Sequence, residues 1–487
     1  MSVNTKPNVL IIMADEHAPQ FSGVYGHPMV RTPNLDRLGS EGVVFDGAYC
    51  NSPLCVPSRM SLMTGRLASA DGVYDNASPL PSDTVTWAHL LRSVGYDVAL
   101  AGKQHFVGPD QLHGFTAQLA HDLHASALHP IYSWDDGVAP ATKPWFHFET
   151  MGPGVTAEIE TDDEVERQSL NFIRSKADSE KPWVLMSSFI APHFPFIAPE
   201  KYWDIYDPDL VDMPDIPAGH LAAQHPLYAR LRSTFGVDHV TENQIRRARA
   251  GYYALMTYLD DKIGALLAAL EETGQGRDTI VVYTADHGEM LGEHGLWRKS
   301  VFYEHSARVP LVIRWPGVAV GGQRIPEAAS LIDLVATLVE IAGAEPTRPI
   351  EGSSLTSLLG GRDSSWKDEA ISEYLAHGVL GPMAMLRRGR YKFNYVHGEG
   401  PELYDLDADP GEFTNLAESS EHRPVLDELR AALLHRWDPQ NLDARVRQSQ
   451  RDRILIRDAT SDLTKTADSS GALVWGSADK GEGPPTR

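Results

Sequence analysis

The chain has 487 residues, which fits one large α/β domain with an appendage, or roughly three domains at about 150 residues each. Apolar side chains make up 42% and charged side chains 22%, with 40 glycines and 33 prolines, which excludes a collagen-like or wholly disordered chain. The 43 basic and 66 acidic side chains give a net charge of −23, so neither nucleic acid nor an anionic membrane is expected as the main partner.

Cysteine usage and hydropathy indicate the compartment. The only two cysteines, Cys50 and Cys55, cannot form a disulfide framework and are typical of a reducing environment. The N-terminal segment lacks the features of a signal peptide, and no apolar run approaches the ~20 residues of a membrane span. We therefore expect a soluble, cytoplasmic protein.

Four apolar runs, each ending in ionisable residues, are typical of strands that are covered on both faces of a parallel sheet. They are Asn8–Ala14, Tyr96–Ala101, Trp183–Ile190 and Thr279–Ala285. A helical pattern over Arg246–Glu272 lies between the third and the fourth. Strands alternating with helices predict an α/β fold with a parallel sheet, whose ligands lie at the carboxyl ends of the strands.

From about residue 371 the pattern changes to short alternating strands, including Arg390–Tyr395 and Glu402–Leu406, followed by a helix near Pro424–Trp437. We predict a catalytic domain over 1–370, a small C-terminal α+β subdomain with an antiparallel sheet over 371–440, and a tail over 441–487. The last residues, from about Asp458, are rich in Ser, Asp, Gly and Thr. The tail is expected either to be disordered or to be an oligomerisation arm that packs on a neighbouring subunit.

The most specific motif is CVPSRMSLMTG at residues 55–65. Pro57 suits the first turn of a helix, which places Cys55 at a helix N-terminus, where negative charge is favoured. The segment resembles the signature of type I sulfatases, members of the alkaline phosphatase superfamily in which this cysteine is oxidised to formylglycine. The resemblance implies a large mixed, mostly parallel sheet flanked by helices.

A second motif, GYDVALAGKQH at residues 95–105, resembles the other sulfatase signature. It is not a P-loop, because six residues rather than four separate its two glycines and no Ser or Thr follows Lys103. The segments at 73–77, 107–115 and 306–310 are similar to the choline-sulfatase-like branch of the family.

The resemblance implies a sulfuric ester hydrolase with defined roles for matching residues. A hydroxyl of hydrated formylglycine at Cys55 attacks sulfur, and His193 protonates the leaving oxygen. His105 then takes a proton from the second hydroxyl, so that sulfate is expelled. The sulfuryl oxygens are neutralised by three cationic side chains, Arg59, Lys103 and Lys299.

A divalent cation is expected beside this nucleophile. Asp15, Asp286 and His287 offer two carboxylates and an imidazole at strand ends, and modified Cys55 completes the ligand set. Three roles stay open for Glu16: a direct ligand, a ligand through water, or a more distant position. The resemblance favours calcium, with manganese or magnesium as alternatives.

The substrate is expected to be a small sulfate ester, either an aryl sulfate or choline sulfate. Asn76 and Trp134 occupy positions that match the substrate site of the choline-sulfatase-like branch, and an aromatic face can receive a quaternary ammonium. Two other functions remain possible: a phosphonate monoester or phosphodiester hydrolase, and a non-catalytic anion-binding relative. The resemblance also implies a formylglycine-generating maturation enzyme as a partner, and a homodimer or homotetramer.

The other histidines in and near these segments are expected to have surface or packing roles, because a single histidine without strand-end placement rarely forms part of a site. These are His113, His121, His124 and His129. His294 is the histidine most expected to depart from this pattern and to belong to a site.

Overall fold

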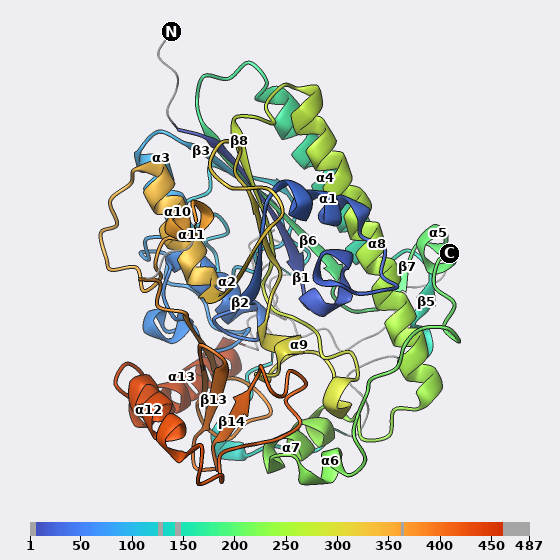
Figure 1. The fold of residues 1–487 in the computed structure, drawn as a ribbon. Helices are drawn as coiled ribbons and strands as arrows, with labels where there is room; N and C mark the ends of the chain where they lie inside the picture. The colour runs from blue at the N-terminus through green and yellow to red at the C-terminus, as the bar shows by residue number, and fades with distance from the viewer. Residues whose placement is uncertain (1–5, 125–129, 142–147, 362–364, 461–487) are drawn as a thin grey trace.

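A computed structural model describes residues 6–124, 130–141, 148–361 and 365–460. Its centre is an eight-stranded sheet (Figure 1). In spatial order the strands are β10 (Gln323–Ser330), β2 (Val43–Tyr49), β9 (Leu311–Arg314), β8 (Thr279–Ala285), β1 (Asn8–Asp15), β6 (Trp183–Pro192), β3 (Asp97–Gly102) and β4 (Ala117–Ala120). All neighbouring pairs are parallel except those of β9, which runs antiparallel to β2 and β8.

The expected α/β architecture is confirmed, and each predicted strand is present. The seven residues from Val9 to Asp15 are all buried, which explains the unbroken apolar run of β1. The predicted helix is α8 (Glu242–Glu272), which begins one turn earlier than its apolar pattern. Thr241 accepts a hydrogen bond from the Gln244 N–H and the Gln244 side chain accepts one from the Thr241 N–H, so a capping box starts it.

Helices cover both faces of the sheet (Figure 1). One face carries α8 with α1 (Pro33–Glu41) and α4 (Ala157–Ser175), and the other carries α2 (Cys55–Thr64), α3 (Trp87–Ser93) and α10 (Leu331–Ala342). The remaining short elements of this part are β5 (Gly152–Pro153), β7 (Ile197–Ala198), α5 (Glu200–Trp203), α6 (His220–Ala223), α7 (Pro226–Phe235), α9 (Glu304–Ala307) and α11 (Thr356–Leu359).

The C-terminal part adds a second, antiparallel sheet, as expected. Its strands, in order, are β11 (Glu369–Tyr374), β12 (Met383–Arg388), β13 (Tyr391–Val396) and β14 (Glu402–Asp405), followed by α12 (Arg423–Leu434). The division of the chain into parts at 1–370, 371–440 and 441–487 stays a prediction.

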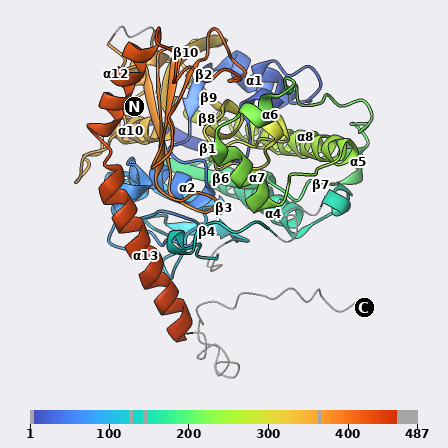
Figure 2. The ribbon, with the colours of Figure 1, turned by 90° about the horizontal axis from the view of Figure 1, so that it is seen from below.

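Residues 439–460 form a further helix, α13 (Pro439–Thr460), where the sequence pattern predicts only a tail. Leu442 and Val446 are buried one turn apart, but the next position on this stripe is the buried Gln450. The polar residue at that position interrupts the apolar pattern and explains why no helix is predicted. Beyond its buried part α13 extends away from the body (Figure 2). The predicted tail beyond residue 460 lies outside the described residues.

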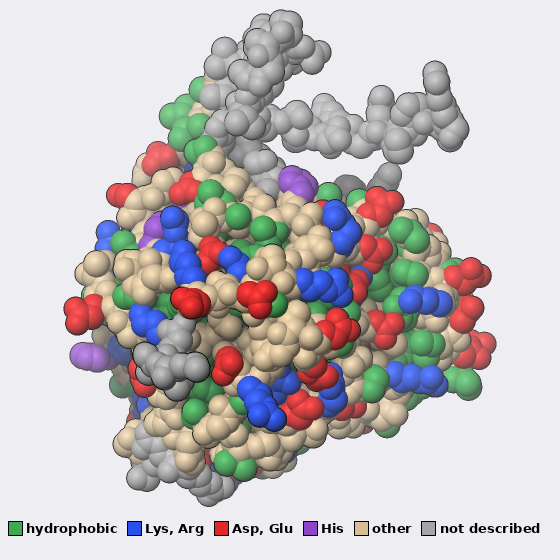
Figure 3. Space-filling model, turned by 90° about the horizontal axis from the view of Figure 1, so that it is seen from above, with side chains coloured by type: hydrophobic (Ala, Val, Ile, Leu, Met, Phe, Trp, Pro, Cys, Tyr) green, Lys and Arg blue, Asp and Glu red, His purple; other side chains and the backbone are tan. Residues whose placement is uncertain are grey.

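Charge and hydropathy of the surface agree with the composition. Acidic and basic side chains are interspersed on the face shown in Figure 3. Among the described residues, no helix combines the length and hydropathy needed to cross a bilayer.

Candidate functional site

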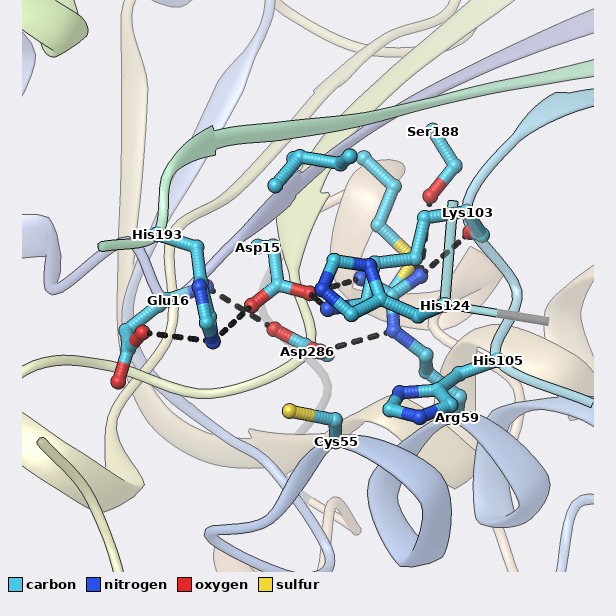
Figure 4. A network of polar contacts seen from close by, with 12 residues as sticks. Asp15, Glu16, Cys55, Arg59, Lys103, His105, His124, Ser188, His193 and Asp286 are labelled. Atoms are coloured by element: carbon cyan, nitrogen blue, oxygen red, sulfur yellow. Dashed lines mark hydrogen bonds and ion pairs between the residues drawn. The ribbon is translucent and has the colours of Figure 1, made fainter. Parts of the chain in front are cut away.

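Four adjacent strands, β8, β1, β6 and β3, deliver ionisable side chains to one edge of the sheet. Figure 4 labels most of these side chains and shows them converging beside the first residue of α2, Cys55. The group comprises Asp15 and Glu16 after β1, Lys103 and His105 after β3, His193 after β6, and Asp286 and His287 after β8. The expected meeting of strand ends that are up to 270 positions apart is therefore present in the fold.

Cys55 is 2% exposed and begins α2. Its Sγ lies 3.2 Å from Nε2 of His287. Burial acts to raise the pKa of the thiol, but Lys299, Lys103 and His287 outweigh it and hold the pKa well below its usual value. The position of residue 55 therefore stabilises negative charge.

Asp15, Cys55, Asp286 and His287 form a compact set of metal-ligating side chains, whose ligand atoms all lie within 4.8 Å of one another. Asp15 Oδ1 is buried and accepts no hydrogen bond within the described part of the chain, so one oxygen remains for a cation. Nδ1 of His287 lies 3.0 Å from the Gly288 carbonyl, which leaves Nε2 to face the other ligands. Mixed carboxylate and imidazole donors fit a divalent cation.

Arg59 lies beneath this cluster rather than in the cavity above it. Its side chain is fully buried, with Nε donating to Asp286 Oδ2 at 2.8 Å and Nη2 donating to Asp15 Oδ2 at 2.9 Å. Nη1 donates to the Lys103 carbonyl at 2.7 Å and to Ser188 Oγ at 3.0 Å. Arg59 thus orients two carboxylates, and we revise its expected role as a direct partner of sulfate.

Lys103 follows Gly102, the last residue of β3, where only glycine fits. Gly102 has a φ of +90°, and a Cβ there would lie 2.2 Å from the Ser188 carbonyl oxygen. This close approach lets the Lys103 N–H donate to the same oxygen at 3.0 Å. Lys103 Nζ reaches Asp15 Oδ2 at 2.5 Å.

His193, Lys299 and Glu16 form a second group of contacts in the site. Lys299 Nζ lies 3.2 Å from His193 Nε2 and donates to Glu16 Oε1 at 2.9 Å. His193 Nδ1 lies 2.6 Å from the Phe194 carbonyl, so the proton on that nitrogen is donated locally and Nε2 faces the site. Burial raises the pKa of Glu16 to about 7, against the opposing charges of His193 and Lys299.

A cavity of about 240 Å³ opens above this group. Cys55, Asn76, Lys103, His105, His193 and Lys299 all line it. Asn76 Oδ1 also accepts a hydrogen bond from the Val56 N–H at 3.0 Å, so Asn76 supports the first turn of α2. The cavity therefore gathers five of the six predicted catalytic residues and one predicted substrate residue.

Trp134 lies outside the lining of this cavity. Its indole N–H donates to the Ala376 carbonyl at 2.9 Å, its backbone N–H donates to Gln450, and Arg447 covers its ring. It lines a neighbouring cavity of about 570 Å³ instead. The geometry favours the interpretation of Trp134 as a packed loop residue over a substrate contact.

Several cavity-lining residues were not expected from the sequence. They are Asp75, His124, Tyr132, Glu158, Phe194, Arg298 and His377. His124 was expected to have a packing role, but its ring lies 5.5 Å from that of His105. His294, the expected exception, stacks on Tyr303 at 3.8 Å and pairs with His220 at 2.8 Å, away from the cavity. Asp75, Phe194 and Arg298 each follow or precede a predicted site residue, and this adjacency is the sequence signal for the group.

Comparison with known proteins agrees with this geometry. The model of the sulfatase family matches residues 7–344, and that of the N-sulphoglucosamine sulphohydrolase C-terminal region matches residues 292–438. A choline-sulfatase of Rhizobium meliloti is 38% identical, covering 93% of this chain and 91% of the relative. An arylsulfatase of Clostridium perfringens is 30% identical, covering 88% of this chain and 94% of the relative.

Solved structures share the fold. A phosphonate monoester hydrolase from Silicibacter pomeroyi has a TM-score of 0.73 and 28% identity, covering 90% of this chain and 96% of that chain. The corresponding enzyme of Agrobacterium radiobacter has a TM-score of 0.72 and 27% identity, covering 88% of this chain and 95% of that chain. With a family model that spans the whole sheet and the residues around Cys55, the chain belongs to the sulfatase family.

Proposed function

We propose that this protein hydrolyses small organic sulfate monoesters to an alcohol or phenol and inorganic sulfate, with formylglycine formed from Cys55 as the nucleophile. The observation that carries the proposal is that Cys55 lines a cavity of about 240 Å³ together with Lys103 and Lys299, whose charges lower the pKa of its thiol. In a chain with a net charge of −23, this pair gives one small place that attracts an anion.

Oxidation of Cys55 would supply what a thiol lacks: the aldehyde hydrate has one hydroxyl to attack sulfur and a second through which sulfate can leave. His193 Nε2, which faces the cavity, protonates the leaving oxygen. His105, which lines the same cavity, takes the proton of the second hydroxyl. Lys103 and Lys299 hold the sulfuryl oxygens, a charge interaction worth roughly 3 kcal/mol for each donor.

A divalent cation fits the cluster of Asp15, Asp286 and His287, together with residue 55. It would supply Lewis-acid polarisation of the sulfuryl group and lower the pKa of the attacking hydroxyl. Glu16 pairs with Lys299, and its other oxygen lies 3.2 Å from His193; it shares with Asp15 and His193 a second set of side chains that could hold a cation. Calcium is our first assignment, with manganese and magnesium as alternatives.

The cavity volume fits a small ester better than a sulfated polymer. Tyr132 and Glu158 line it together with the residues around Cys55, and an aromatic ring with a carboxylate would suit a quaternary ammonium. The printed functions of the two relatives, choline-sulfatase and arylsulfatase, define the two substrate classes to be compared. A phosphonate monoester or phosphodiester hydrolase is the second candidate function, favoured by the structural neighbours.

Presence of both Lys103 and His105 favours sulfate over phosphoesters, because relatives that act on phosphonates tend to replace them. The test is a panel of choline sulfate, an aryl sulfate, a phosphonate monoester and a phosphodiester. We expect kcat/KM for at least one sulfate ester to exceed both phosphorus esters by at least about 100-fold, a difference of roughly 3 kcal/mol in transition-state binding. A preference for either phosphorus ester would reject the proposal.

Removal of the cation gives a second test. We expect metal-depleted protein to lose at least about 100-fold in kcat, because the Lewis acid contributes several kcal/mol, and to unfold at a lower temperature. Calcium, manganese and magnesium are then added back separately, and elemental analysis confirms depletion and occupancy. The variant Asp15→Asn should lose most of the thermal response to added metal. Full activity after verified depletion would contradict a catalytic cation.

We further propose that the protein is cytoplasmic, is modified by a formylglycine-generating enzyme and assembles as a homodimer or homotetramer. Both cysteines are free and buried, which fits a reducing compartment. Size measurement by light scattering at several concentrations tests the assembly state.

A further inference from the structure

Two buried aspartates outside the cavity accept hydrogen bonds from the backbone of the segments that carry His105 and His193. Asp122 follows β4, and Asp162 lies within α4. Each accepts hydrogen bonds from two consecutive backbone N–H groups at or just before a site histidine. Because a buried carboxylate is stable only when it is well hydrogen-bonded, such paired contacts fix both partners.

Asp122 holds the loop of His105. Its Oδ2 accepts from the Gln104 N–H at 2.8 Å and from the His105 N–H at 2.6 Å, while Oδ1 accepts from the His124 N–H at 2.9 Å. The φ of His105 is +61°, a left-handed conformation that costs roughly 1–3 kcal/mol for a residue with a side chain. The loop therefore needs an external partner to keep His105 in this conformation.

Asp162 holds the loop of His193 in a different way. Its Oδ1 accepts from the Ile190 N–H at 2.7 Å and its Oδ2 accepts from the Ala191 N–H at 2.8 Å, so each oxygen carries one bond. The side chain is fully buried. Burial raises its pKa to about 7, although the two backbone donors oppose this. The two donors, Ile190 and Ala191, are among the last residues of β6 and lie three and two residues before His193.

We propose that Asp122 and Asp162 are positioning residues, each of which holds one histidine and thereby controls one half of the reaction. This inference rests on the proposed function. In the first half, the attacking hydroxyl of residue 55 gives its proton to water and its oxygen forms a bond to sulfur, while the bond from sulfur to the ester oxygen breaks and the leaving oxygen receives the proton of His193. In the second half, His105 accepts the proton of the remaining hydroxyl, the bond from residue 55 to the sulfate oxygen breaks, and the aldehyde is restored.

Loss of each aspartate should therefore leave a different signature. In Asp122→Ala, a displaced His105 slows sulfate release, so aryl sulfates should give a burst of phenol, a fall of about 10–100-fold in kcat and a parallel fall in KM. Rapidly quenched protein should carry sulfate on the peptide that contains residue 55. In Asp162→Ala, a displaced His193 slows the first half of the reaction. The loss of kcat should therefore be larger for aryl sulfates whose phenol is a poorer leaving group. The peptide that contains residue 55 should carry no sulfate.

Conservative variants sharpen the test. In Asp122→Asn, the amide oxygen can still accept from both Gln104 and His105, and the NH₂ group opposes only the His124 N–H, so the His105 loop keeps its contacts and much of the activity should return. In Asp162→Asn, the amide NH₂ must face one of two N–H donors, so activity should stay low. Hydrogen exchange, which does not depend on turnover, should rise at residues 104–105 in Asp122→Ala and at 190–191 in Asp162→Ala.

A matched control is available in Asp260, a buried aspartate of α8 that accepts from the backbone N–H groups of Asn34 and Leu35, away from the site. Asp260→Ala should lower stability without a burst or a changed dependence on the leaving group. The inference is overturned if the wild type hydrolyses sulfate esters but Asp122→Ala and Asp162→Ala share the control's pattern. A wild type that carries formylglycine yet hydrolyses no sulfate ester would instead reject the proposed function.

Discussion

Replacement of Cys55 by alanine is expected to reduce kcat for sulfate esters by at least about 10⁴-fold, the scale of loss when a covalent nucleophile is removed. Alanine lacks the thiol through which Cβ is oxidised to the aldehyde, and the cation loses one ligand position. The measurement is steady-state turnover, together with peptide mass spectrometry of residue 55. Wild-type protein made with a competent maturation enzyme should show the aldehyde or its hydrate.

Cys50 provides the matched control for this experiment. It is also buried, but burial raises the pKa of its thiol, in contrast to the lowered pKa of Cys55. Cys50→Ala should keep turnover within a few-fold of the wild type and cost about 1 kcal/mol of stability. Wild-type turnover in Cys55→Ala, or only free thiol at residue 55 in fully active protein, would contradict the proposed nucleophile.

Arg59→Leu is expected to cause the second large loss, in both activity and stability. The substitution leaves the buried carboxylates of Asp15 and Asp286 without their shared guanidinium, which should cost about 3–5 kcal/mol in the metal-free protein. The displaced carboxylates should also lower kcat by at least about 10³-fold. Chemical denaturation and steady-state kinetics measure the two effects.

The stability measured with and without added divalent cation distinguishes this role of Arg59 beside the cation-binding carboxylates from a merely structural role. The cation neutralises the same two carboxylates, so it should restore more stability to Arg59→Leu than it adds to the wild type. Lys392→Met is the control, because Lys392 is equally buried and also pairs with two carboxylates, Glu304 and Glu412. Lys392→Met should be destabilised, and the cation should add no more stability to this variant than it adds to the wild type. Equal recovery in both variants would contradict the assigned position of Arg59.

The sequence allowed the sheet and most of the candidate site to be predicted, because the relevant signals are local. Uninterrupted apolar runs mark the central strands, and ionisable residues directly after them, such as Asp15 and Asp286, mark their carboxyl ends. The parallel arrangement then brings these residues together whatever their separation in the chain.

Other features depend on packing and have no local signal. The side chain of Arg59 belongs to a motif that suggests sulfate contact, yet its direction is set by the two carboxylates beneath it. Asp122 and Asp162 act on backbone groups of other segments, so nothing around them in the sequence marks them. Helix α13 was missed because Gln450 occupies a buried position where an apolar residue would have completed the pattern.

The position of β1 in the middle of the sheet also bears on how the chain folds during synthesis. Its two neighbours, β6 and β8, are made about 170 and 270 residues later. At roughly 5–20 residues per second, the second partner is complete only roughly 15–50 seconds after β1 itself. Until β6 is made, this apolar strand has both edges open, and until β8 is made it still has one, which makes folding slow and the nascent chain prone to aggregation. During the same interval Cys55, which the finished fold buries, is accessible to other molecules.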